Sequence, residues 1–183
     1  MSKELSHLNT LKDAFTASYL QLLHDYSPNQ ITVKQIVEKA NASRSSFYTY
    51  YESREHLHFH VKELLQRKLL MFYEKEEHEI HKETTTFELC QHIIKYRAYY
   101  QFAFSDANEI QYMSKALSER LIEVYNDKDY AIFASYGTIG YLKNWVEEGF
   151  LISPAEASEK LLKIGFTDWT RDLRKRIVNE FPQ

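Results

Sequence analysis

The sequence has few of the residues that interrupt regular structure, with only 4 glycines and 3 prolines in 183 residues. Long stretches run without either residue, so the chain lacks the punctuation that a sandwich or barrel of many strands would need. A hydrophobic content of 44% is still enough to build a core in one or two small domains. These proportions favour an all-helical protein.

Cysteine is almost absent, since Cys90 is the only one. A single cysteine cannot form an internal disulfide, and no pair stands at metal-binding spacing. The N-terminus lacks an apolar segment of the signal-peptide kind, and the longest uncharged apolar-rich run, residues 130–142, is too short to span a bilayer. We therefore expect a cytoplasmic protein that does not bind a membrane.

A basic excess is also missing, because 23 basic and 26 acidic residues give a net charge of -3. This balance counts against nucleic acid at first, since phosphate-binding domains usually carry a positive charge. From residue 32 to residue 54, however, Lys34, Lys39, Arg44 and Arg54 stand against only two glutamates. A small basic head on an acidic body is compatible with DNA binding and predicts weak non-specific affinity.

The first part of the chain has the apolar spacing of helices. Apolar residues step by threes and fours from Leu5 to Tyr26, which places them on one face of a helix that ends before the turn around Pro28. Thr32 and Gln35 then form a capping box for a short second helix.

A third helix follows after an interruption of three residues. Asn41 tolerates the left-handed conformation, and Ser43 is suited to cap a helix over residues 44–51. Ser53 caps a fourth helix, which directs apolar side chains inward at positions 57, 61, 64, 65 and 69. Two short helices joined by such a turn predict a helix-turn-helix, which lays its second helix in the DNA major groove.

The predicted DNA-contacting residues lie mainly on that third helix. Arg44 is its only side chain able to make a bidentate contact with guanine. Contacts to bases or phosphates are open to its short hydroxyl side chains, Ser45, Ser46 and Thr49. Four residues are better suited to contact the phosphate backbone and so position the protein on the DNA, namely Thr32, Lys34, Tyr48 and Tyr50.

The alternative is that two capped helices followed by tyrosines simply pack locally. The run of tyrosine and phenylalanine between Phe47 and Tyr51 favours the DNA-binding interpretation. One short helix cannot bury so many rings, so some of them must lie on an accessible surface.

Residues 31–57, ITVKQIVEKANASRSSFYTYYESREHL, resemble the DNA-binding signature of TetR-family regulators. In that family a threonine that caps the second helix also touches phosphate, which corresponds to Thr32. The resemblance matches Ser43 to the serine before the recognition helix, Phe47 and Tyr48 to the aromatic pair, and Arg54 to a basic phosphate-binding residue. The chain departs from the family at three positions, with Asn41 for a turn glycine, Tyr50 for a common histidine and Tyr51 for a phenylalanine.

Beyond about residue 66 the sequence changes character. A charged run at 74–83 is followed by aromatic-rich segments that we expect to be helical near 86–104, 108–125 and 129–148. After a break at 149–154, a last amphipathic helix begins near Pro154 and continues with apolar residues that include Trp169, Leu173 and Ile177.

The resemblance implies that this second part senses a ligand and forms a dimer. The segment from Tyr141 to Phe150 is similar to a C-terminal pattern of some TetR-type regulators, in which two helices per subunit form the dimer interface. We therefore expect a helix-turn-helix DNA-binding domain over residues 1–66 and a helical regulatory and dimerisation domain over residues 67–183.

A group of aromatic residues in this second domain is a candidate lining for an apolar ligand pocket, because such pockets combine aromatic walls with a few hydroxyls. An ordinary hydrophobic core is the alternative for each of them. The candidates are Tyr96, Tyr99, Tyr100, Phe102, Phe104, Tyr112, Phe133 and Tyr136.

Histidines are the remaining chemical signal. His56 and His60 share a helix face as zinc ligands can, and three further histidines are His58, His78 and His81. No cysteine lies nearby and the surrounding glutamates are typical of a solvated face, so we predict no metal site. The sequence also has no glycine-rich phosphate loop and no nucleophile elbow, so we predict neither a cofactor nor an enzyme.

These observations predict an effector-responsive repressor that binds a pseudo-palindromic operator in double-stranded DNA as a homodimer. Its effector is expected to be a small molecule. The alternative is a helical protein-interaction dimer with a degenerate DNA-binding head, which the low overall basicity favours.

Overall fold

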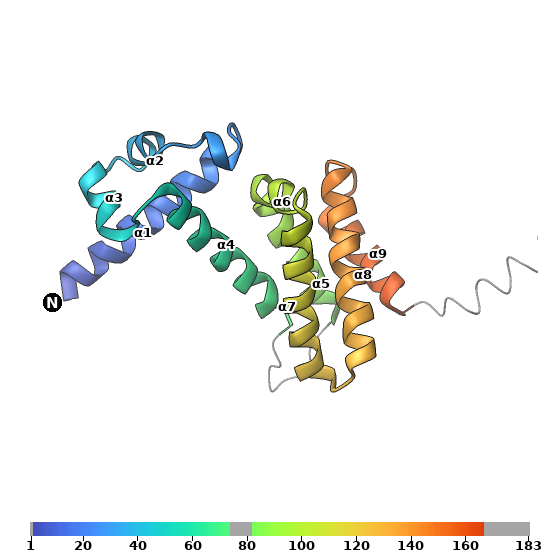
Figure 1. The fold of residues 1–183 in the computed structure, drawn as a ribbon. Helices are drawn as coiled ribbons and strands as arrows, with labels where there is room; N and C mark the ends of the chain where they lie inside the picture. The colour runs from blue at the N-terminus through green and yellow to red at the C-terminus, as the bar shows by residue number, and fades with distance from the viewer. Residues whose placement is uncertain (1, 74–81, 167–183) are drawn as a thin grey trace, which may run out of the picture.

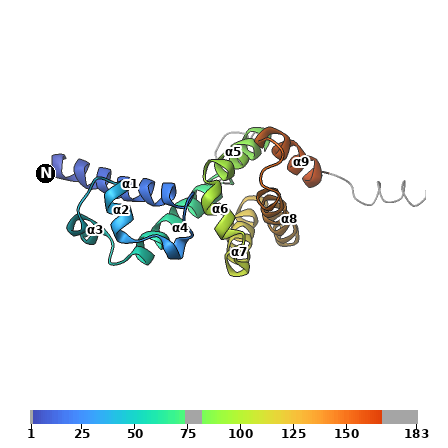
Figure 2. The same ribbon diagram turned by 90° about the horizontal axis from the view of Figure 1, so that it is seen from above.

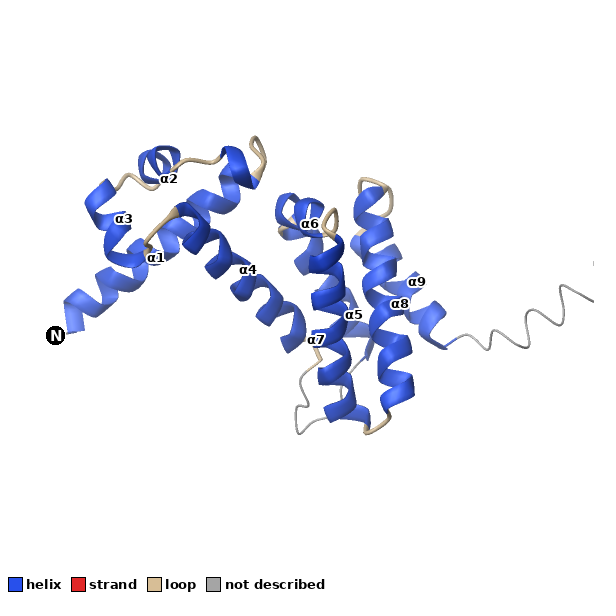
Figure 3. Ribbon diagram, in the orientation of Figure 1, coloured by secondary structure: helices blue, strands red, loops and turns tan. Residues whose placement is uncertain are grey.

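The structure is a computed structural model that describes residues 2–73 and 82–166. Within those ranges all regular structure is helical, which confirms the predicted all-α class (Figure 3). The helices form a head and a body that lie side by side (Figure 1, Figure 2). None of the described helices is long and apolar enough to cross a membrane.

The head contains α1 (Ser2–Leu22), the short 3-10 helix η1 (Pro28–Gln30), α2 (Val33–Lys39) and α3 (Arg44–Tyr50). Helix α4 (Arg54–Met71) joins it to the body. The body contains α5 (Lys82–Lys95), α6 (Arg97–Ala103), α7 (Ala107–Tyr125), α8 (Lys128–Glu147) and α9 (Pro154–Phe166). Its most extensive helix pairs are α7 with α8 and α5 with α9.

Aromatic side chains form the core of the head. Phe15 of α1 lies 5.4 Å from the ring of Phe47 and 6.4 Å from that of Tyr51, in edge-to-face geometry. These three rings and Leu57 of α4 are buried. Burying each such side chain stabilises the fold by about 1.5–3 kcal/mol, so this cluster fixes α3 against α1 and α4.

The predicted caps of the head are confirmed. The Thr32 hydroxyl accepts from the backbone N–H of Gln35 at 3.3 Å, and the Gln35 side chain accepts from the Thr32 backbone N–H at 2.8 Å. Asn41 has a φ of 49°, which is the left-handed turn that ends α2. Ser43 and Ser53 accept from backbone N–H groups at the starts of α3 and α4.

Helix α1 ends at Leu22, earlier than the apolar spacing predicts. The backbone N–H groups of His24 and Asp25 donate to carbonyls three residues back, so the last turn tightens and the helix does not continue. Tyr26, expected on the buried face, is exposed as a result.

Helix α4 is a continuous rod of 18 residues, about 27 Å long, from the head into the body. It runs through residue 66 without a break. Lys62 forms an ion pair with Glu109 of α7, and the Gln66 amide donates to the same carboxylate at 3.2 Å. Helix α4 is therefore tied to both parts of the molecule.

The segment expected as one helix over 86–104 is two helices, α5 and α6, which meet at Tyr96. No glycine or proline marks this break. Across it the His92 ring hydrogen-bonds the Tyr100 hydroxyl, with Nε2 and Oη 2.8 Å apart, and both residues are buried. This tertiary contact holds the bend and has no signal in the local sequence.

The predicted break between α8 and α9 is confirmed. Gly149 and Phe150 adopt positive φ values of 71° and 61°. The indole N–H of Trp145 donates to the Ile152 carbonyl at 3.0 Å, which fixes this turn against α8. Ser153 caps α9, and the predicted apolar residues Trp169, Leu173 and Ile177 lie outside the described residues.

Candidate nucleic-acid interface and ligand cavity

Helix α3 has one buried side and one exposed side. Phe47 is fully buried and fixes the helix, while the Tyr48 side chain is 56% exposed and touches Phe47 only with a ring edge at 5.5 Å. The exposed strip, which we name the α3 face, consists of Arg44, Ser45, Tyr48 and Thr49. Spacings of three and four residues place these side chains next to one another on the helix.

The side chains of the α3 face differ in what they already bind. Arg44 has no ion-pair partner among the described residues, so its guanidinium is available to a ligand outside the chain. The Thr49 hydroxyl donates to the Ser45 carbonyl at 3.1 Å. Ser46, predicted as a contact, is half-buried, and its hydroxyl lies 2.8 Å from that of Ser43.

Helix α2 precedes α3 in the head (Figure 1). Thr32 is exposed there, and its hydroxyl donates to the Gln35 side chain. Lys34 is exposed and lies 3.8 Å from Glu38, a pair too solvated to hold the ammonium firmly. Tyr50 is half-buried, with its ring 6.2 Å from that of Phe15.

The structure gives Arg54 bonds within the head itself. Its guanidinium donates to the carbonyls of Pro28, Asn29 and Ile31 at 2.6 to 3.2 Å and also pairs with Glu55. These bonds hold the loop before α2 against the start of α4. The loop position, and with it the start of α2, therefore depends on Arg54.

The aromatic residues predicted as ligand contacts are not gathered around one space. Tyr99, Tyr100 and Phe104 are buried in the core, and Phe102 packs against it. Tyr96 is half-buried beside Lys95, whereas Tyr112 and Tyr136 are exposed.

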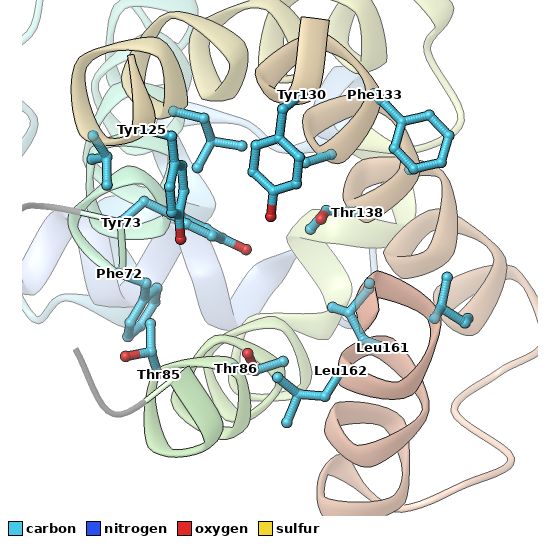
Figure 4. Close-up of a pocket in the computed structure, with 16 residues that line it drawn as sticks. Phe72, Tyr73, Thr85, Thr86, Tyr125, Tyr130, Phe133, Thr138, Leu161 and Leu162 are labelled. Atoms are coloured by element: carbon cyan, nitrogen blue, oxygen red, sulfur yellow. The ribbon is translucent and has the colours of Figure 1, made fainter. Parts of the chain in front are cut away.

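A cavity of about 170 Å³ lies instead among the end of α4 and helices α5, α7, α8 and α9 (Figure 4). Of the predicted aromatic residues, Phe133 lines it. The floor is apolar and includes Phe72, Leu121 and Leu161. Six hydroxyl-bearing residues line it, namely Tyr73, Thr85, Thr86, Tyr125, Tyr130 and Thr138.

The sequence pattern does not predict that these six residues line a cavity. They come from three helices, α5, α7 and α8, and from the residue pair that follows α4, so no local spacing brings them together. The one local signal is the pair Tyr125 and Tyr130 on either side of a turn, whose rings lie 5.2 Å apart.

Burial shapes the chemistry of this cavity. It raises the pKa of the Tyr73 phenol far above its usual range, against the smaller lowering effect of a hydrogen bond with Thr138. Burial also raises the pKa of the nearby Cys90 thiol to about 12. Both groups are therefore neutral at physiological pH, and the surroundings disfavour charge.

A second, more open cavity of about 440 Å³ lies between the head and the body. Helix α1 lines one side, and residues around Tyr96 and Tyr99 line the other. These two predicted residues therefore lie next to a cavity, but at the junction of head and body.

The histidines of α4 have protein partners. The Nδ1 atom of His56 accepts from the Glu52 backbone N–H at 3.3 Å, and that of His58 lies 2.8 Å from the Tyr19 hydroxyl. His60 packs against the Tyr51 ring. No group of three potential metal ligands occurs within the described ranges, and His78 and His81 lie outside them.

Comparisons with known proteins agree with this architecture. Residues 83–165 match the family model TetR_C_8, described as a transcriptional regulator C-terminal region. A TetR transcriptional regulator from Streptococcus agalactiae superposes with a TM-score of 0.62 at 21% identity, covering 90% of this chain and 98% of that one. A regulator from Aquifex aeolicus superposes with a TM-score of 0.66 at 19% identity, covering 85% and 99%.

The dihydroxyacetone kinase operon activator DhaS gives a TM-score of 0.68 at 15% identity, covering 85% of this chain and 93% of that one. At these identities the superpositions show a shared fold over nearly the whole of each chain. A comparison with curated protein sequences found no match.

Proposed function

We propose that this chain is a TetR-family transcriptional regulator, which binds operator DNA as a homodimer and responds to a small molecule. The match of its C-terminal region and its shared fold support this proposal. The DNA-binding head spans residues 1–66, and the regulatory and dimerisation body spans residues 67–183. The protein acts as a repressor in the cytoplasm, and it is a regulator and not an enzyme.

The α3 face is the observation that carries the DNA-binding proposal. An arginine without an ion-pair partner among the described residues, an exposed tyrosine and two hydroxyl residues form one strip on a helix whose other side is anchored by Phe47. Arg44 can bind guanine in two places at once, and the hydroxyls suit bases or phosphates. Six residues at the edges of this strip either hold the helix in place or contact the phosphate backbone, namely Thr32, Lys34, Ser43, Ser46, Tyr50 and Arg54.

An apolar patch on α8 supports the homodimer. Phe133 is 67% exposed, and Ile132 and Tyr136 are also exposed on the same helix. Ile164 of α9 is exposed as well. Because rings of this size are seldom left in water in such a group, we assign a second copy of the chain to this patch. A two-fold dimer then presents two copies of α3 to the two halves of a pseudo-palindromic operator.

Helix α4 supports coupling between ligand and DNA. Phe72 and Tyr73 at its end line the cavity, whereas Leu57 near its start packs in the core of the head. A ligand that moves the end of α4 therefore changes the spacing of the two α3 helices in the dimer. By linkage, DNA weakens the binding of such a ligand by the same factor.

The test is a gel-shift titration of the protein on DNA from upstream of its own gene, at two salt concentrations. Salt-sensitive retardation is expected, together with its loss in Arg44→Ala and Tyr48→Ala. Arg97→Ala, at an exposed arginine of the body, is the matched control and leaves the retardation unchanged. Equal binding by Arg44→Ala, Tyr48→Ala and wild type would contradict the proposal.

A further inference from the structure

The cavity among α4, α5, α7, α8 and α9 has a chemical character that narrows the proposed effector. None of the described residues that line it is aspartate, glutamate, lysine, arginine or histidine. In Figure 4 the hydroxyls of Tyr73, Tyr125, Tyr130 and Thr138 point toward its centre, above the apolar side chains of Leu161 and Leu162. Among the described residues, the site therefore offers hydrogen bonds and apolar contact but no ionic partner.

We infer that this cavity binds an uncharged, largely apolar molecule that carries one or two hydrogen-bonding groups. The inference deepens the proposed function and rests on it, because it names the class of effector. It concerns the residues of this cavity and not the junction between head and body.

The cost of burying charge excludes the charged alternatives. A carboxylate or ammonium taken out of water without an opposite charge loses several kcal/mol, which hydroxyls alone do not restore. Phenol and threonine hydroxyls both donate and accept, so they suit an alcohol, a phenol, a ketone or an amide. The Tyr73 phenol is neutral at physiological pH, as tyrosines ordinarily are, and burial raises its pKa further, so it supplies no anion that would attract a cation.

The volume limits the size of the enclosed part of the ligand. An apolar cavity of about 150 Å³ accommodates benzene. This cavity, of about 170 Å³, holds one six-membered ring with a short substituent. The aromatic walls from Phe72, Tyr125 and Tyr130 suit a flat ring.

Three small probes of similar shape and different charge test the inference. Benzyl alcohol is neutral, benzoate is an anion and benzylamine is a cation at neutral pH. Saturation-transfer NMR with the full-length protein, without DNA, measures the binding of each. We expect benzyl alcohol to bind at least about tenfold more tightly than either charged probe, because an unpaired charge costs more than 1.4 kcal/mol to bury.

Variants locate the binding in this cavity. Ala134→Phe fills it from α8 and Val124→Trp fills it from α7, so both are expected to abolish the benzyl alcohol signal. Ala155→Phe, at an exposed position of α9 that does not line the cavity, is the matched control and retains it. Thr138→Val keeps the side-chain size and removes a hydroxyl. It is therefore expected to weaken the binding of benzyl alcohol several-fold and to leave the binding of toluene unchanged.

The inference is overturned if benzoate or benzylamine binds as tightly as benzyl alcohol and both filling variants abolish that binding. It is also overturned if no neutral probe binds the folded wild-type protein, or if the filling variants leave binding intact. The gel shift is a separate measurement, so retarded DNA with no probe binding removes this inference and leaves the DNA-binding function standing. Probe binding without DNA retardation keeps the inferred ligand class and removes the DNA-binding function.

Discussion

Phe47 and Tyr48 are neighbours on α3 with opposite expected roles, and replacing each by alanine separates folding from DNA binding. Phe47 has no exposed surface and contacts the rings of Phe15 and Tyr51 at 5.4 and 5.5 Å. Removing such a ring leaves a cavity as well as losing burial, so Phe47→Ala is expected to cost about 3–5 kcal/mol of unfolding free energy.

Tyr48 is more than half exposed, and its ring meets that of Phe47 edge to face. Tyr48→Ala is therefore expected to cost no more than about 1 kcal/mol of stability, the range of one aromatic pair. Its effect is on DNA, where loss of the ring and its hydroxyl weakens retardation of upstream DNA about tenfold or more, as for a contact worth at least 1.4 kcal/mol.

The assays are urea unfolding and gel-shift titration on the same preparations, with all variants at one protomer concentration because dimer stability depends on it. Tyr48→Phe serves as the control that keeps the ring and removes the hydroxyl. Equal losses of stability in Phe47→Ala and Tyr48→Ala would refute the orientation of α3. Undiminished DNA binding by a folded Tyr48→Ala protein would refute the assignment of the exposed face.

Three further perturbations test other parts of the structure. Ser43→Ala removes the cap of α3, in which the Ser43 hydroxyl accepts from the Ser46 backbone N–H at 3.0 Å. In urea unfolding it is expected to lower the free energy of unfolding by about 1 kcal/mol. The control Ser45→Ala is expected to change this free energy little. Phe133→Asp places a charge in the α8 patch and is expected to give a monomer in light scattering, with loss of DNA retardation; a dimer of unchanged mass would place the interface elsewhere. Burial, with smaller effects of Lys68 and Lys95, lowers the pKa of His92 to about 4, so the folded protein stays unprotonated there while the unfolded chain takes up a proton near its usual pKa of about 6.5. The contribution of His92 to the free energy of unfolding is therefore fully present above pH of about 6.5 and is lost as the pH decreases toward 4, by about 3 kcal/mol at most. The His92→Gln protein is expected to show a shallower pH dependence in the same unfolding titration.

Local signals predicted the head well because its elements are set by neighbouring residues. Thr32 with Gln35, Asn41 and Ser43 each act over three or four residues, so their types and spacing are sufficient to place α2, the turn and α3. The end of α1 was placed too late because apolar spacing continues to Tyr26, although the backbone tightens after Leu22.

The body was predicted less completely because its decisive contacts leave no trace in the spacing of apolar residues. The bend at Tyr96 depends on a hydrogen bond between His92 and Tyr100 inside the core, and a periodic apolar pattern passes through it unchanged. The cavity combines Tyr73 after α4 with Tyr130 and Thr138 of α8, so its lining follows from packing and not from spacing. Tyrosine richness indicated hydroxyls near apolar walls, but it did not indicate which tyrosines.

The proposed function requires two copies of α3 to contact one operator, and footprinting of upstream DNA by hydroxyl radicals tests this requirement. Two protected half-sites related by two-fold symmetry are expected on one face of the duplex, about 34 Å or a multiple of that distance apart. The Arg44→Ala protein is expected to lose this protection while remaining folded and dimeric. A single unsymmetrical footprint, or the same footprint with Arg44→Ala, would contradict the account.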